Sequence, residues 1–142
     1  MELVDTHCHL DVAAFDVDRE VVLQRARAAG VTRFIVPAID ADRWTDVVRL
    51  RDQEAEISIA LGMHPLCMDR HHPLHLRALG EAVASSGPVA IGEIGLDYYI
   101  ENADREAQRE LLAAQLDIAA DANLPVILHV RKAHDDVIAL LR

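Results

Sequence analysis

The stretch PVAIGEIG at residues 88–95 is a short apolar run, and a longer amphipathic segment follows it in the chain. The run PVILHV at residues 125–130 begins a second pair of this kind. Runs of this kind are typical of strands in a parallel sheet that is covered by helices. The same alternation precedes them along the chain, with ELVD (2–5), RFIV (33–36) and ISIAL (57–61). Five successive β-then-α units predict an α/β fold built on a parallel sheet.

The amphipathic segments after these runs are predicted helices, at residues 17–29, 41–53, 74–86, 104–122 and 133–142. Gly30 follows the first of them, where a left-handed residue commonly ends a helix. Asp104 stands at the start of the fourth, where its carboxylate can accept a hydrogen bond from a backbone N–H. Leu112, Leu116 and Ala119 are spaced to form one apolar face of that helix, which we expect to pack on the sheet.

The composition is typical of a folded, soluble protein. The 142 residues are 51% hydrophobic and 27% charged, so a single domain comprising residues 1–142 can bury a core. No apolar run approaches the ~18 residues that span a bilayer, and the N-terminus lacks the pattern of a signal peptide. Cys8 and Cys67 are too few for a disulfide framework. We therefore expect a cytoplasmic protein without a membrane partner.

The net charge of -10 separates two classes of function. It disfavours a broad basic face, which non-specific binding of nucleic acid requires. An acidic enzyme can still cleave a phosphodiester when metal ions and a few arginines supply local positive charge. The charge therefore argues against a DNA-binding module and leaves a metal-dependent enzyme open.

The length leaves two α/β architectures open. Five strands could complete a doubly wound sheet, whereas a (β/α)8 TIM barrel takes about 250 residues, roughly a hundred more than this chain has. The last predicted helix, at residues 133–142, has no Gly, Pro or polar tail to end it. If the fold is of the TIM-barrel type, we expect the chain to cover about the first five βα units and to be truncated at its C-terminus.

Two histidines, His7 and His9, follow the first apolar run in the motif DTHCHLD. On a strand, a spacing of two residues turns both imidazoles to the same side, which makes a metal site plausible. Cys8 then points away from them, and we do not expect it to be a ligand. Asp5 is a candidate partner that fixes the tautomer of one imidazole, as metal-bound histidines usually require.

Glu93 and His129 come at the finishing ends of the fourth and fifth predicted strands. In a parallel barrel the C-terminal ends of all strands open onto one mouth, so both residues would meet His7 and His9 there. Imidazole nitrogens and a carboxylate oxygen suit Zn²⁺, Mn²⁺ or Fe better than Ca²⁺, or Mg²⁺ alone. A carboxylate can also bridge two ions, and a pair of ions activates water for the hydrolysis of a phosphodiester.

Four motifs together resemble a known family: DTHCHLD at 5–11, GMHP at 62–65, GEIGLDYY at 92–99 and PVILHVRKAHDD at 125–136. In this order they are similar to the TatD family of metal-dependent deoxyribonucleases, which belongs to the amidohydrolase-like TIM barrels. The match runs over the whole chain and corresponds to the N-terminal part of the family's barrel. The resemblance implies a hydrolase that cleaves DNA phosphodiester bonds, commonly as an exonuclease, through a metal-activated water.

The resemblance also implies two divalent metal ions in the complete enzyme, with Zn, Mn and Mg as candidates. His7 and His9 resemble ligands of the first ion, Glu93 resembles the bridging carboxylate, and His129 resembles a ligand of the second ion. The family adds a histidine after the sixth strand and an aspartate after the eighth, and this chain ends before either. These four side chains supply about five of the roughly eight bonds that two ions take. We therefore expect an incomplete site, and the activity of this chain alone is left open.

Two further residues are candidates for contact with a DNA substrate. His64 in GMHP resembles the family's histidine near the scissile phosphate, which makes it, with Glu93, a candidate catalytic residue. By its position alone, His64 is equally a strand-end residue packed beside Pro65. Arg131 lies two residues beyond His129 and could pair with a phosphate through its planar guanidinium group.

The remaining histidines and the tyrosines have simpler interpretations. His71, His72 and His75 match the spacing of no rigid metal site, and we expect them in a solvated loop and at the start of a helix. Tyr98 and Tyr99 could stack on a base, but two aromatic residues after a strand more often pack within a loop.

Two alternatives to the deoxyribonuclease stay open. The same metal chemistry can attack a carbonyl, so a metal-dependent amidase or deacylase of the same superfamily would carry the same local motifs. The chain could instead be a catalytically incomplete fragment that acts as a binding or assembly module. Five strands that do not close leave two sheet edges and an inner face uncovered, which favours self-association.

Overall fold

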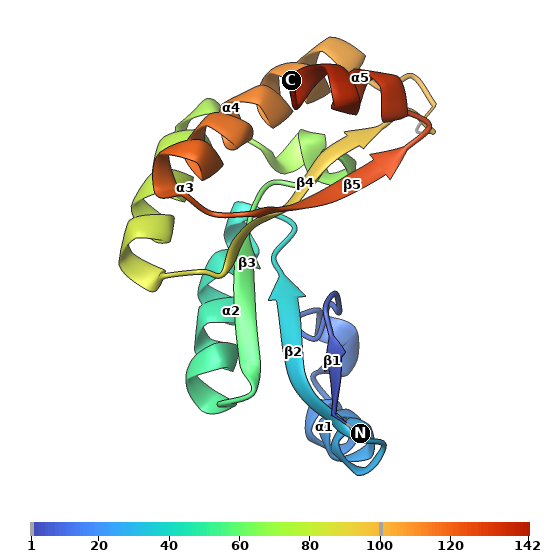
Figure 1. The fold of residues 1–142 in the computed structure, drawn as a ribbon, viewed down its shortest axis with the longest axis vertical. Coiled ribbons are helices and arrows are strands. Elements are labelled where there is room, and N and C mark those ends of the chain that lie inside the picture. Colours follow the sequence, from blue (N-terminus) through green and yellow to red (C-terminus); the bar gives the residue numbers. More distant parts are fainter. Residues whose placement is uncertain (1, 100) are drawn as a thin grey trace.

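A computed structural model describes residues 2–99 and 101–142 and shows one parallel five-stranded sheet. Its strands follow the chain order β1-β2-β3-β4-β5, and each pairs with the next in parallel. The strands are β1 (Leu3–Asp5), β2 (Val31–Pro37), β3 (Ile57–Leu61), β4 (Ala90–Asp97) and β5 (Val126–Arg131). The sheet curls so that β4 and β5 cross the direction of β1 to β3 (Figure 1). This half-barrel confirms the predicted α/β class and its TIM-barrel type.

In the described part of the chain, five α-helices alternate with the strands, close to where the sequence predicts them. They are α1 (Arg19–Ala28), α2 (Ala41–Gln53), α3 (Pro73–Ser86), α4 (Arg105–Ala122) and α5 (His134–Leu140), with short 3-10 helices at Ala13–Phe15 and Pro65–Arg70. Asp104 caps α4 as predicted, because its side chain accepts from the backbone N–H of Ala107 at 3.0 Å. Gly30 has the positive φ of 95° expected after α1. Within the described ranges, no helix is long and apolar enough to cross a membrane.

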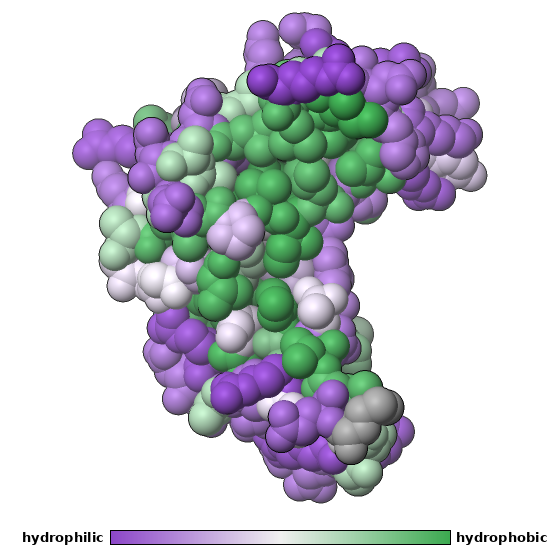
Figure 2. All heavy atoms as spheres, in the orientation of Figure 1, coloured by the Kyte–Doolittle hydropathy of each residue, from purple (hydrophilic) through white to green (hydrophobic). Residues whose placement is uncertain are grey.

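The core lies between the helices and the central strands. Every residue of β4 is buried, and so are four of the five residues of β3. β5 differs from the prediction of a strand covered on both faces, because its residues from Val126 to Val130 are only half-buried. Leu3 and Val4 on β1 are exposed as well. Figure 2 shows hydrophobic side chains gathered over one continuous face of the molecule. Strands of a half-barrel lack the neighbours that would cover this face.

A close approach of β4 and β5 brings the candidate site residues together. Gly95 pairs with His129, and a Cβ atom at Gly95 would lie 1.9 Å from the carbonyl oxygen of His129. Only glycine therefore leaves room for the two backbones at this point. Glu93 lies at an irregularity in the register between Ile91 and Ile94, inside β4 rather than at its end.

Two buried glutamines of α4 fix the backbone of neighbouring segments. Gln115 accepts from the N–H of Met63 at 2.7 Å and donates to its carbonyl at 3.1 Å. Gln108 accepts from the N–H of Asp97 at 2.8 Å and donates to its carbonyl at 3.2 Å. The face of α4 that we predicted from leucine and alanine positions is therefore partly polar, since it satisfies peptide groups where the strands end.

Candidate metal centre

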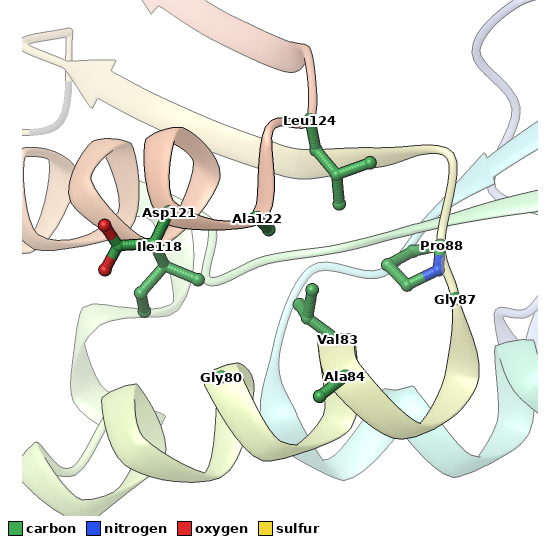
Figure 3. A pocket seen from close by; sticks show the side chains of 9 residues that line it. All are labelled: Gly80, Val83, Ala84, Gly87, Pro88, Ile118, Asp121, Ala122 and Leu124. Atoms are coloured by element: carbon green, nitrogen blue, oxygen red, sulfur yellow. The ribbon is translucent and has the colours of Figure 1, made fainter.

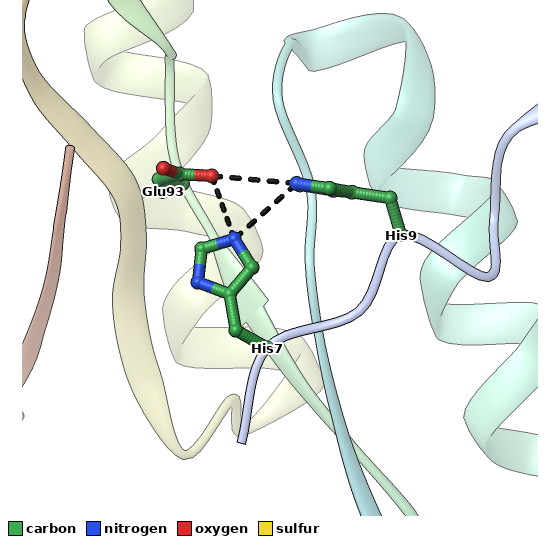
Figure 4. A group of neighbouring side chains, drawn as sticks. All are labelled: His7, His9 and Glu93. Atoms are coloured by element: carbon green, nitrogen blue, oxygen red, sulfur yellow. Dashed lines mark hydrogen bonds and ion pairs between the residues drawn. The ribbon is translucent and has the colours of Figure 1, made fainter. Parts of the chain in front are cut away.

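His7, His9 and Glu93 form one compact cluster. The two histidines follow β1, and Glu93 comes from the middle of β4. Figure 4 shows both imidazoles directed at the same carboxylate oxygen. Glu93 Oε2 lies 2.9 Å from His7 Nε2 and 3.4 Å from His9 Nε2, and the two Nε2 atoms are 3.3 Å apart. One ligand atom from each side chain lies within 4.8 Å of the others, which is close enough to share a metal ion.

The other oxygen of Glu93 faces a second pair of histidines. Glu93 Oε1 lies 3.2 Å from His129 Nδ1 and 3.4 Å from His64 Nε2. Ligand atoms of these three residues again lie within 4.8 Å of one another. Glu93 is only 6% exposed, so its carboxylate is a buried group between two sets of imidazoles. This is the arrangement that a bridging carboxylate requires.

In His9 and His64, the ring nitrogen that faces away from Glu93 makes a hydrogen bond that decides which nitrogen carries the proton. The Nδ1 atom of His9 lies 3.1 Å from the carbonyl oxygen of Pro37, which accepts its proton. When the ring of His9 is neutral, its Nε2 atom therefore presents a lone pair to the cluster. The Nδ1 atom of His64 instead accepts from the backbone N–H of Leu66 at 3.0 Å. Neutral His64 therefore carries its proton on Nε2, and it presents a hydrogen-bond donor rather than a ligand atom.

A carboxylate partner of an imidazole is present, but at a residue we did not predict. His129 Nε2 lies 2.9 Å from Oδ2 of Asp97, at the end of β4. The prediction for Asp5 is wrong, because its Oδ1 accepts from the backbone N–H of His7 at 3.1 Å, and it contacts no imidazole among the described hydrogen bonds. Asp97 stands four residues after Glu93, a spacing that puts two strand residues on one side of a sheet. That spacing was the signal available in the sequence.

The electrostatics of the metal-free protein match a cation site. Burial raises the pKa of Glu93, but its close contacts with the imidazoles of His64, His9 and His7 outweigh burial, so this pKa lies well below its usual range. The hydrogen bond to Glu93 raises the pKa of His9, against the opposing effect of burial. The carboxylate is thus held ionised among nitrogen atoms. Such a donor set fits divalent ions of the zinc and manganese type.

Arg131 and the tyrosines follow the strand residues that carry His129 and Asp97. The guanidinium carbon of Arg131 is 3.7 Å from the centre of the Tyr99 ring, and Lys132 Nζ is 4.5 Å from it. Arg131 therefore packs on an exposed aromatic ring rather than against the histidines. Tyr98 packs within the fold as predicted, because its hydroxyl donates to Asp136 Oδ2 at 2.6 Å.

Cys8 is turned away from the imidazoles, as predicted, although residues 6–9 lie beyond the end of β1 rather than on a strand. Its Sγ atom lies 3.7 Å from the carbonyl oxygen of Ile35 on β2. Burial, with the neighbouring charge of Asp5, raises the pKa of this thiol to about 12. A thiol that stays protonated is a poor metal ligand, so the sulfur is not part of the candidate centre.

The loop histidines are more ordered than we predicted. His72 caps α3 by accepting from the N–H of Leu74 at 3.2 Å, and the N–H of His72 donates to His75 Nδ1 at 3.3 Å. His71 is half-buried, and its Nε2 donates to the carbonyl oxygen of His64 at 2.8 Å. The prediction of a solvated loop is therefore wrong for His71, which supports the segment carrying His64.

An apolar groove between α3 and α4 is a separate feature (Figure 3). Most of its lining is small or aliphatic, and Asp121 is its one ionisable residue. It is bounded by Pro88 and Leu124, which precede β4 and β5, whereas the histidine clusters face the later parts of these strands. The groove therefore does not belong to the candidate metal centre.

Fold and side-chain geometry together define a class of protein: a parallel α/β half-barrel with histidine and carboxylate clusters that suit divalent metal ions. The family model for TatD related DNase matches residues 4–142. The chain belongs to this family, which confirms the resemblance carried by its four motifs.

Individual relatives agree with this assignment. The uncharacterized metal-dependent hydrolase YjjV of Escherichia coli K12 is 42% identical over 134 residues, which are 93% of this chain and 52% of the relative. The crystal structure of YjjV, a TatD homolog from E. coli K12, matches with a TM-score of 0.94 and 40% identity, over 98% of this chain and 54% of that chain. The 3'-5' ssDNA/RNA exonuclease TatD of Erwinia tasmaniensis is 34% identical over 149 residues, or 99% of this chain and 54% of the relative. This chain thus spans about half the length of the curated relatives that it matches.

Proposed function

We propose that this chain provides most of the metal centre of a metal-dependent hydrolase that cleaves phosphodiester bonds in DNA. One observation carries the proposal: the two oxygens of buried Glu93 face different sets of histidines. Two relatives support it, since one is a metal-dependent hydrolase and the other an exonuclease acting on single-stranded DNA and RNA. The cytoplasmic location stays a prediction.

The residues of the chain divide between two ions. His7, His9 and Glu93 would hold one divalent ion, and Glu93 with His129 would hold the second. Zn, Mn and Mg are the candidate metals. When bound, such ions supply the Lewis acidity that ionises a water molecule and neutralises charge on a phosphate. Glu93 is suited to this role because it stays ionised and uses both of its oxygens.

Two other residues would act on the substrate. Neutral His64 presents its Nε2–H beside Glu93, where it would donate a hydrogen bond to a phosphate oxygen. Arg131, held on the face of Tyr99, would contact the DNA backbone nearby. Because the chain carries a net charge of -10, binding of DNA would depend on such local groups and on the ions rather than on a general basic surface.

A metal analysis combined with a cleavage assay tests the proposal. The purified chain, kept free of chelators, is analysed for bound metal per chain and assayed on a fluorescent single-stranded oligodeoxynucleotide with and without EDTA. We expect bound Zn or Mn, cleavage that EDTA abolishes, and loss of both in E93Q. The control is E81Q, whose glutamate forms an exposed pair with Arg77 on α3.

Two results would contradict the proposal. A chain that binds no added Zn²⁺ or Mn²⁺ has no metal centre of the proposed kind. A chain that binds metal but hydrolyses N-acyl amino acids instead of the oligonucleotide would be an amidase or deacylase.

A further inference from the structure

We propose that Asp97 is a positioning residue of the metal centre, which fixes the ring of His129 and the nitrogen that it presents. Oδ2 of Asp97 lies 2.9 Å from His129 Nε2, closer than Glu93 Oε1 lies to Nδ1, so in the neutral ring it is the oxygen that accepts the proton. The opposite ring nitrogen, Nδ1, then faces Glu93 Oε1 at 3.2 Å as a lone pair. The role toward a metal rests on the proposed function, whereas the tautomer is a property of the chain itself.

Asp97 is held rigidly enough to select one tautomer. It is 0% exposed, and its other oxygen, Oδ1, accepts from the backbone N–H of Tyr99 at 2.9 Å. Gln108 binds both the N–H and the carbonyl of Asp97, so helix α4 fixes the backbone that carries the carboxylate. With Oδ1 occupied, Oδ2 is the oxygen that meets the imidazole. A buried acceptor in this position favours a protonated Nε2.

The inner side of His129 shows why that tautomer matters. An Nδ1 lone pair and an ionised Glu93 oxygen both accept hydrogen bonds, so at 3.2 Å they do not satisfy each other. A cation placed among these atoms would satisfy both. The same ring with its proton on Nδ1 would donate to Glu93 and would block this ligand position. Asp97 therefore keeps His129 in the state that can bind metal.

The other histidines provide an internal comparison. In His9, the backbone carbonyl of Pro37 accepts the proton of the ring nitrogen that faces away from Glu93, and no side-chain substitution removes this carbonyl. In His64, the backbone N–H of Leu66 donates to Nδ1, so the neutral ring carries its proton on the nitrogen that faces Glu93. Of these three, His129 alone depends on a side chain for its outer hydrogen bond. Its tautomer can therefore be changed by a single isosteric substitution, D97N.

Nitrogen-15 NMR of the histidine side chains tests the tautomer directly. In the metal-free chain, at a pH where the ring is neutral, we expect His129 to be protonated on Nε2. In D97N the amide group can turn its NH2 toward Nε2, so we expect the proton to move to Nδ1. D40N is the matched control, because Asp40 is also buried, at 1% exposed, and pairs with Arg70 instead of a histidine.

Titration with Zn²⁺ provides the second measurement. Loss of a carboxylate partner of a metal-bound imidazole typically weakens metal binding about 10- to 100-fold, and we expect a loss of this size in D97N but not in D40N. An Nδ1–H tautomer in the unsubstituted chain would overturn the inference even if neither variant folds. An unchanged tautomer and Zn²⁺ affinity in folded D97N would do the same. A protonated Nε2 that moves in D97N upholds the inference even if the chain cleaves no DNA, so its failure and that of the proposed function are distinguishable.

Discussion

At the scale of single residues, the position of one proton decides what each histidine of the candidate centre can do. His9 and His64 both lie within 3.4 Å of an oxygen of Glu93, yet they present opposite groups to it. The difference comes from one backbone atom on the far side of each ring, a carbonyl oxygen for His9 and an N–H for His64. Proximity to a carboxylate therefore does not by itself identify a ligand.

This difference predicts separate effects for two substitutions. H9A is expected to lose bound metal, because it removes a lone pair from the first cluster. H64A is expected to keep the metal and to lower oligonucleotide cleavage by about 100-fold, the usual effect of losing one hydrogen-bond donor to a developing charge. Metal content by elemental analysis and cleavage rate are measured on the same samples. Equal loss of metal in both variants would show that His64 is a ligand.

The sequence predicts part of this picture. The spacing of His7 and His9, and the place of Glu93 and His129 in neighbouring predicted strands, predict that these four residues meet. The role of Asp97 could not be assigned, because its partner lies 32 residues away and the contact depends on how closely β4 and β5 approach. The tautomers depend on backbone atoms, which no residue type reveals.

At the scale of helices and strands, α4 connects the core to the candidate centre. Gln115 binds the peptide group of Met63, next to His64, and Gln108 binds that of Asp97, next to Tyr98. The two glutamines are seven residues apart, so they lie on the same face of the helix. α4 thereby fixes two separate segments that carry polar residues of the site.

We predict that Q115L destabilises the fold. Leucine would leave the buried N–H and carbonyl of Met63 without partners, at a cost of about 2–4 kcal/mol. Urea unfolding followed by circular dichroism measures the loss. Q24L on the exposed side of α1 is the control, since Gln24 bonds only Glu20 among the described contacts, and we expect a change within about 0.5 kcal/mol. A stability of Q115L equal to that of the control would contradict the argument.

A second prediction concerns the link between α1 and the segment before β3. Arg27 donates to Glu54 and Glu56 at 2.7 Å each. Burial raises the pKa of Glu56, but the hydrogen bond from Arg27 outweighs it and lowers this pKa below 4.5. The stabilisation is therefore complete above pH 4.5 and is lost as the pH falls through the lower value in the folded state.

R27A tests this pH dependence. Because the group is exposed and screened by solvent, we expect R27A to lose about 0.5–1 kcal/mol at pH 7. The difference from the unsubstituted chain should shrink below pH 4.5 in urea unfolding series. R77A, which removes an exposed pair within α3, is expected to have a smaller effect. A loss in R27A that stays constant down to pH 3 would rule out the assigned cause.

The sequence predicts the order and approximate limits of the elements, because apolar runs and amphipathic segments alternate clearly. It does not predict the polar face of α4, since the sequence does not show which backbone groups Gln108 and Gln115 bind. Nor does it predict the half-burial of β5. An apolar strand sequence indicates a strand that is buried on both faces, but it does not show whether the segments that would bury them are present in the structure.

At the scale of the whole molecule, the half-barrel has two free sheet edges within the described residues. β1 pairs only with β2, and β5 pairs only with β4. The hydrophobic face in Figure 2 is continuous, and both edge strands contribute apolar side chains that are exposed or half-buried. Unpaired strand edges beside such a surface favour pairing with another chain. We therefore predict that the isolated chain self-associates.

Sedimentation velocity over a range of protein concentrations measures this association against a monomer mass of 15.7 kDa. V4K places a charge on the edge strand β1 and is expected to shift the chain toward monomer. V21K is the matched control, because Val21 is 53% exposed and Val4 is 55% exposed, but Val21 lies on helix α1. We expect V21K to associate like the unsubstituted chain. Equal shifts in both variants would assign the association to general hydrophobicity, and a concentration-independent monomer would show that the open edges do not drive association.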